Sequence, residues 1–138
     1  MTASFQSRPV ELVRDCQTVL SHAWMIRAFL RHCEDAEDFP ELFELDRAIF
    51  ELCRALEPYA EEPASYFKAL RKKIGGFKTA VAKFAVDAPA ASAHTNFLQA
   101  VLSAQGCSAA LERCLAEATA LGLLNPKTST AQSEQGIG

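Results

Sequence analysis

Hydrophobic residues recur along this chain at intervals of three and four positions, the spacing that places them on one face of a helix. Between residues 9 and 33 the stripe consists of Leu12, Val13, Cys16, Val19, Leu20, Ala23, Ile26 and Leu30. Comparable stripes predict further helices over residues 40–57, 64–86 and 93–121. No segment shows the two-residue alternation of a strand, so the pattern predicts an all-α protein.

Short connections containing prolines and small polar residues separate the predicted helices. We expect Ser7 to cap the first helix, residues 87–91 to connect the third helix to the fourth, and Ser92 or Thr95 to cap the fourth. Amphipathic helices joined by short loops favour an antiparallel, up-down-up-down four-helix bundle.

Small residues interrupt two of the predicted helices. Gly75 and Gly76 lie in the middle of the third helix, where they favour a close helix crossing or a slight kink. The alternative is a ligand that approaches the backbone at this point. In the fourth helix, Ala104, Gly106 and Ser108 are expected to let a neighbouring helix come close.

The composition is that of one globular domain. The 138 residues are 49% hydrophobic and 22% charged, and the net charge of −3 provides no general attraction to nucleic acid or to a membrane. We expect a domain over residues 1–124 and a disordered polar tail over residues 125–138. Five cysteines without a Cys-x-x-Cys pair favour a reduced, cytoplasmic protein, and neither a signal peptide nor a membrane span is predicted.

Residues 22–33 are apolar on almost every side of the predicted helix, whereas an ordinary surface helix buries a single stripe. Trp24 lies on one flank of the core-facing stripe, and His22, Met25 and Phe29 lie on the other. Apolar surface that one small domain does not cover usually marks a partner site. The segment therefore predicts a non-catalytic interaction protein, either a homodimer or a small adaptor, with these four residues at the interface.

Two charged residues fall inside apolar stripes. Arg27 lies on the core side of the first helix, and Asp46 lies on the core side of the second. If the chain turns near residues 36 and 37, the two positions are level with each other. Buried charges are tolerated when they are paired, so we predict a partly buried salt bridge that sets the register of the helices. The alternative is a polar site in the interior.

Positive charge is concentrated in the third helix, which contains six bases and no acid between residues 64 and 86. Lys68, Arg71, Lys72 and Lys83 lie opposite its apolar stripe. They are expected either to offset the acidic second helix or to bind an anionic ligand or an RNA backbone. His94, at the start of the fourth helix, is a further anion-binding candidate, with plain capping as the alternative.

Residues suited to cofactor chemistry are few. No Glu-x-x-His motif is present, and His22 and His32 are too far apart along a helix to share a zinc ion, so no metal is predicted. A haem held by His22, Met25 or His94 is the alternative to ordinary packing of these side chains. We expect no cofactor.

The hexapeptide Arg27-Ala28-Phe29-Leu30-Arg31-His32 resembles the Arg-x(4–6)-His element of HEPN-type ribonucleases, which are small helical dimers. The resemblance covers these six residues, and it departs from the pattern because Ala28 replaces the polar residue usual after the arginine. It implies a third function, ribonuclease activity that uses Arg27 and His32.

Overall fold

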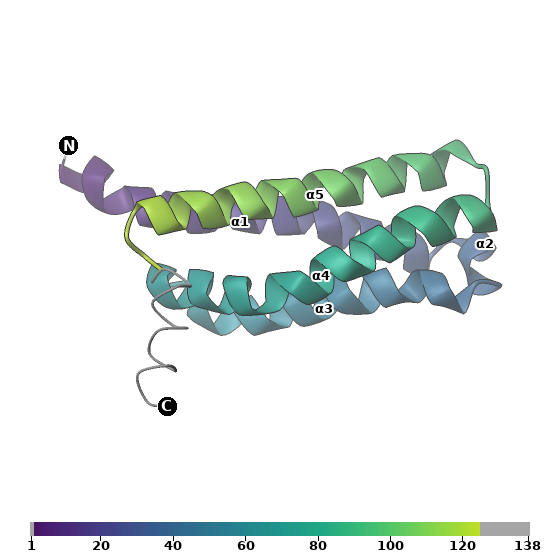
Figure 1. Ribbon diagram of the computed structural model, residues 1–138, viewed down its shortest axis with the longest axis horizontal. Helices are drawn as coiled ribbons and strands as arrows, with labels where there is room; N and C mark the ends of the chain where they lie inside the picture. Colours follow the sequence, from purple (N-terminus) through teal and green to yellow (C-terminus); the bar gives the residue numbers. More distant parts are fainter. Residues whose placement is uncertain (1, 125–138) are drawn as a thin grey trace, which may run out of the picture.

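The computed structural model describes residues 2–124, with side chains from Arg8 onward, and these residues are helical with no strand among them (Figure 1). The long helices are α1 (Thr2–Arg31), α3 (Phe43–Leu56), α4 (Pro63–Ala91) and α5 (Thr95–Ala120). The short elements are α2 (Glu34–Glu37) and the 3-10 turns η1 (Pro40–Leu42) and η2 (Glu57–Tyr59). The all-α prediction is confirmed. The predicted tail, residues 125–138, lies outside the described residues.

The four long helices pack against one another in pairs. Helix α1 contacts α3 and α5, and α4 contacts the same two helices. Figure 1 shows α3 joined to α4 at one end of the molecule and α4 joined to α5 at the other. No helix within residues 2–124 is both long enough and apolar enough to cross a membrane.

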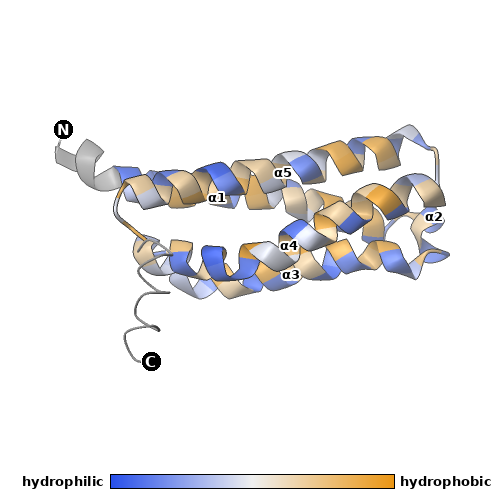
Figure 2. Cartoon of the chain, in the orientation of Figure 1, coloured by the Kyte–Doolittle hydropathy of each residue, from blue (hydrophilic) through white to orange (hydrophobic). Residues whose placement is uncertain are grey.

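The core consists of the predicted apolar stripes. Hydrophobic and hydrophilic residues alternate around each long helix in Figure 2, and the hydrophobic ones supply the buried positions. The largest fully buried side chains are Tyr66, Phe67, Phe77, Phe97, Leu12, Leu30, Leu42, Leu45, Ile49, Leu56, Leu70 and Leu111. Burial of one such aliphatic or aromatic side chain contributes about 1.5–3 kcal/mol, so the helices are held together mainly by this core.

The predicted start of the first helix is wrong. Helix α1 begins at Thr2 and contains Pro9, so Ser7 lies inside the helix and does not cap it. A proline removes one backbone donor and deprives a single carbonyl of its partner. The residues before it can still bond to one another, and the helix therefore continues on both sides.

The predicted connection at residues 87–91 is also helical. Helix α4 continues through Pro89 to Ala91, and the Ser92 N–H donates to the Ala88 carbonyl at 3.0 Å. Ala88 is fully buried, which keeps this last turn docked on the core. Because Pro89 lies two residues before the helix end, its missing hydrogen bond disturbs only the final turn.

His94 caps α5 in place of the predicted Ser92 or Thr95. The Asn96 N–H donates to His94 Nδ1 at 3.0 Å, and the His94 N–H donates in turn to Ser92 Oγ at 3.0 Å. Thr95 is already the first helical residue. A ring nitrogen can thus accept the bond that a hydroxyl oxygen usually accepts at this position.

The glycines of α4 do not mark a close helix crossing. Gly75 and Gly76 are exposed, and a Cβ atom built on either would meet nothing within 4 Å. Gly106 in α5 has the same open surroundings, although Ala104 beside it is buried as expected. The small residues at positions 75, 76 and 106 therefore do not admit a neighbouring helix.

Gly75→Ala is expected to stabilise the protein by about 0.5–1 kcal/mol, because alanine loses less backbone entropy in a helix and meets no atom here. Urea unfolding followed by circular dichroism measures the change. Gly122→Ala is the control: Gly122 has φ +83°, which favours glycine, so this variant should be destabilised. A loss of stability in Gly75→Ala would contradict the open surroundings of Gly75.

Candidate functional site: an apolar cavity between α1 and α3

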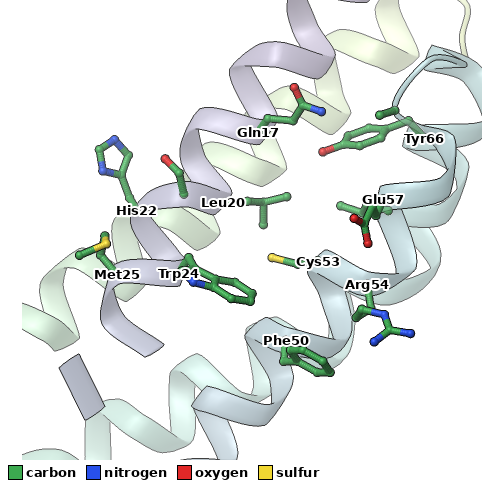
Figure 3. Close-up of a pocket in the computed structure, with 13 residues that line it drawn as sticks. Gln17, Leu20, His22, Trp24, Met25, Phe50, Cys53, Arg54, Glu57 and Tyr66 are labelled. Atoms are coloured by element: carbon green, nitrogen blue, oxygen red, sulfur yellow. The ribbon is translucent and has the colours of Figure 1, made fainter. Parts of the chain in front are cut away.

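An apolar cavity of about 700 Å³ lies between α1 and α3, with η2 and the start of α4 at one end (Figure 3). This volume falls within the range of about 300–1,000 Å³ that is usual for small-molecule sites. The side chains that decide its chemistry are Leu20, Trp24, Phe50, Cys53, Leu56 and Tyr66.

Helical spacing explains how two segments form the walls. Leu20, Ser21 and Trp24 lie three, four and seven residues after Gln17, so all four share one face of α1. The lining residues of α3 and η2 repeat the same spacing at positions 50, 53, 54 and 57. Two faces that meet at the core and separate toward the surface leave a hollow between them.

Arg27 and Asp46, which were predicted to pair, are brought together beside this cavity. Arg27 Nε lies 2.7 Å from Asp46 Oδ1, and their side chains are 17% and 8% exposed. The Nε–H group has no aligned hydrogen-bond acceptor, so the contact is an ion pair. Arg31 Nη1 lies 3.5 Å from the other carboxylate oxygen and adds a second, more exposed cation.

The same arginine contacts the outer wall of the cavity. The guanidinium carbon of Arg27 lies 4.4 Å from the centre of the Trp24 ring and 5.0 Å from that of Phe50. The two rings are 6.4 Å apart and tilted by 40°. Cations over aromatic faces are attracted by the ring quadrupole. Arg27 therefore contacts both rings while it neutralises Asp46.

Tyr66 forms the inner end of the cavity. The residue is 1% exposed, and its hydroxyl oxygen has no hydrogen-bond partner. Its ring packs edge-on against Phe67, with centroids 5.3 Å apart. Figure 3 shows the hydroxyl directed from the start of α4 toward the space between α1 and α3. Because buried hydroxyls normally find partners, this group is the least satisfied polar atom of the site.

Burial favours the neutral forms of Cys53 and Tyr66, which both line the cavity. It raises the pKa of the Cys53 thiol, an effect that nearby Arg27 partly offsets, and it raises the pKa of the Tyr66 hydroxyl. The thiolate is the nucleophilic form of cysteine, so Cys53 is not activated for attack.

The predicted interface residues divide between this cavity and its neighbour. His22, Trp24 and Met25 line the cavity, and in Figure 3 His22 and Met25 point away from its interior. Phe29 does not line it: its ring packs edge-on against Phe97, with centroids 5.6 Å apart. Together with His22 and Met25, Phe29 lines a second groove of about 440 Å³ between α1 and α5.

The predicted anion-binding residues are spread along the molecule. Lys68, Arg71 and Lys72 lie in the first half of α4, whereas Lys83 lies about 16 Å or more farther along the helix. Lys83 pairs with Asp87 and lies 3.5 Å from Glu44. His94 uses Nδ1 to cap α5.

The two residues of the ribonuclease-like hexapeptide have different surroundings. Arg27 is occupied by Asp46 and the two aromatic rings, whereas His32 is exposed just after the end of α1. Within the described part of the chain, no group of three or more His, Cys, Asp or Glu side chains is placed to hold a metal ion.

Sequence reasoning did not single out Tyr66, Phe50 or Cys53 as site residues. Each belongs to an apolar stripe, where an aromatic ring or a thiol is an ordinary core side chain. The sequence offered one indication of a site: Tyr66 places a polar hydroxyl among the apolar residues of the predicted third helix. Whether that hydroxyl has a partner depends on how three separate elements meet, which the sequence does not display.

Comparison with known protein families, with curated proteins and with solved structures finds no match for this chain.

A double-mutant cycle tests the Arg27–Asp46 pair. Arg27→Met and Asp46→Leu should each destabilise the protein by about 2–4 kcal/mol, because each leaves the other charge without its nearest partner. The double variant should lose about 1–2 kcal/mol less than the sum of the two. Urea unfolding of the three variants measures the coupling. Simple additivity would show that the two side chains do not interact.

Tyr66→Phe should raise the free energy of unfolding by about 1 kcal/mol, because it removes a buried hydroxyl without a partner and keeps the ring. Thermal and urea unfolding measure the change. Tyr59→Phe is the matched control, because Tyr59 is 40% exposed. Loss of its hydroxyl should change the free energy of unfolding by less than about 0.5 kcal/mol. A clear loss of stability in Tyr66→Phe would show that the hydroxyl is satisfied in solution.

Proposed function

We propose that this protein is a non-catalytic interaction protein, built as an up-down-up-down four-helix bundle, that self-associates through the surface formed by Trp24, Met25 and Phe50. The observation that carries the proposal is the exposure of these side chains, which is 39%, 64% and 36%. We call them the α1–α3 surface. They surround the mouth of the cavity on two adjacent helices.

The composition of this surface supports a protein partner. Trp, Met and Phe are enriched at the centres of interfaces, and their burial contributes strongly to association. Trp24 and Phe50 are already held by Arg27, so little side-chain entropy is lost when a partner covers them. An ordered aromatic patch next to a flexible methionine is a favourable contact surface.

Charges at the edge of the cavity favour a second copy of the chain as the partner. Arg54 and Glu57 are both exposed, carry opposite charges and lie three residues apart. In a two-fold dimer the same surface meets itself in reverse, so an arginine of one copy can face a glutamate of the other. The α1–α3 surface, together with Arg54 and Glu57 beside it, is therefore suited to meeting a second copy of itself in apolar character and in charge.

The other functions considered have less support. RNA or anion binding by α4 is weakened by the pairing of Lys78 with Glu112 and of Lys83 with Asp87. A ribonuclease role is weakened because Arg27 is committed to Asp46. We also infer a cytoplasmic location, because the five cysteines are free thiols, as is usual in a reducing compartment.

Met25→Lys should abolish self-association with little effect on folding, because Met25 is largely exposed and a lysine there places a charge inside the contact. Sedimentation velocity over a range of protein concentrations measures the oligomeric state. Leu102→Lys is the matched control: Leu102 is 60% exposed on α5, and its replacement should leave the dimer intact. A wild-type protein that stays monomeric throughout the range would overturn the proposal, as would equal disruption by both variants.

A further inference from the structure

The cavity beneath the α1–α3 surface contains a feature that self-association does not explain. Tyr66 is almost completely buried, and its hydroxyl has no partner within the described protein. A partner chain that covers Trp24 and Met25 from outside would not reach this group at the inner end. A group that pairs with the hydroxyl must therefore enter from the cavity itself.

The walls determine the polarity of such a ligand. Leu20, Trp24, Phe50 and Leu56 present carbon surface, and Cys53 directs its sulfur inward (Figure 3). An apolar ligand body gains free energy by leaving water for such walls. Most of the ligand must therefore be hydrocarbon, either aromatic or aliphatic.

The charges determine the ionic state of the ligand. Arg54 and Glu57, at the rim, carry opposite charges and provide no net attraction for an anion or a cation. Burial inside the cavity penalises charge, as the raised pKa values of Cys53 and Tyr66 indicate. A neutral molecule is the one that suits both regions.

We propose that this cavity binds a neutral, largely apolar small molecule that carries one hydrogen-bonding oxygen, and that this oxygen pairs with the hydroxyl of Tyr66. The hydroxyl both donates and accepts, so an alcohol, a phenol or a ketone fits. Gln17, which is exposed, lines the same cavity from α1.

A matched pair of probes tests the proposal. 2-Naphthol and naphthalene have the same ring system, and only the first carries an oxygen. Both are titrated into wild-type protein and into Tyr66→Phe, and the shifts of backbone amides in NMR spectra supply the dissociation constants. Tyr66→Phe should weaken 2-naphthol binding about three- to tenfold and change naphthalene binding less than about twofold, because only 2-naphthol loses a hydrogen bond.

Two results would overturn the proposal. In one, neither probe shifts amides of the cavity walls in the wild-type protein. In the other, Tyr66→Phe weakens both probes equally or neither, which would mean that the ligand oxygen does not meet the hydroxyl.

Thiol protection provides a second measurement that does not depend on the variant. Cys53 lines the cavity, whereas Cys33, which is also partly exposed, lies outside it. Bound 2-naphthol should slow the alkylation of Cys53 by N-ethylmaleimide at least about threefold and leave Cys33 unchanged, as peptide mass spectrometry can measure. Unchanged rates at both cysteines under saturating 2-naphthol would contradict binding in the cavity.

This ligand site is separable from self-association. Tyr66 lies beneath the α1–α3 surface, so Tyr66→Phe should leave the sedimentation behaviour unchanged. A monomeric protein that still binds 2-naphthol selectively would refute only the self-association. A dimer that binds neither probe would refute only the ligand site.

Discussion

The buried carboxylate of Asp46 imposes the strongest constraint on this molecule. It is the one charged residue among those described that is buried, and such a charge is expensive unless a cation accompanies it. Arg27 supplies the cation from α1, which fixes how α1 and α3 are aligned. The guanidinium must lie in one place, and Trp24 and Phe50 pack against it there. The position of the cavity wall thus follows from the need to pair one buried charge.

The pairing of Arg27 with Asp46 could be predicted from the sequence, because it depends on the helical repeat and on how the two helices align. Apolar periodicity located the long helices, and two charges interrupting apolar stripes at level positions indicated the contact between Arg27 and Asp46. Both inferences use distances along a helix, which are fixed by its geometry. They needed no knowledge of how loops or surface side chains are arranged.

Helix ends and the candidate site were harder to predict, for physical reasons. Helix boundaries were predicted near Pro9 and Pro89, yet both helices continue through them. A helical proline loses a hydrogen bond and crowds the preceding turn, a cost that packing can offset, as the buried Ala88 beside Pro89 illustrates. Gly75 was expected to mark a close helix crossing. A glycine in the sequence does not show whether another helix packs against it. The unpartnered hydroxyl of Tyr66 results from three elements meeting, so no local pattern reveals it.

The two ends of the cavity differ in a way that bears on function. At the outer end, Arg27 packs against the rings of Trp24 and Phe50, a contact that favours one arrangement of this wall. At the inner end, the buried hydroxyl of Tyr66 has no partner among the described protein groups. A phenylalanine at position 66 would fill the same space without this hydroxyl. An apolar wall combined with a buried polar group that has no protein partner is the pattern expected where a residue serves binding as well as folding.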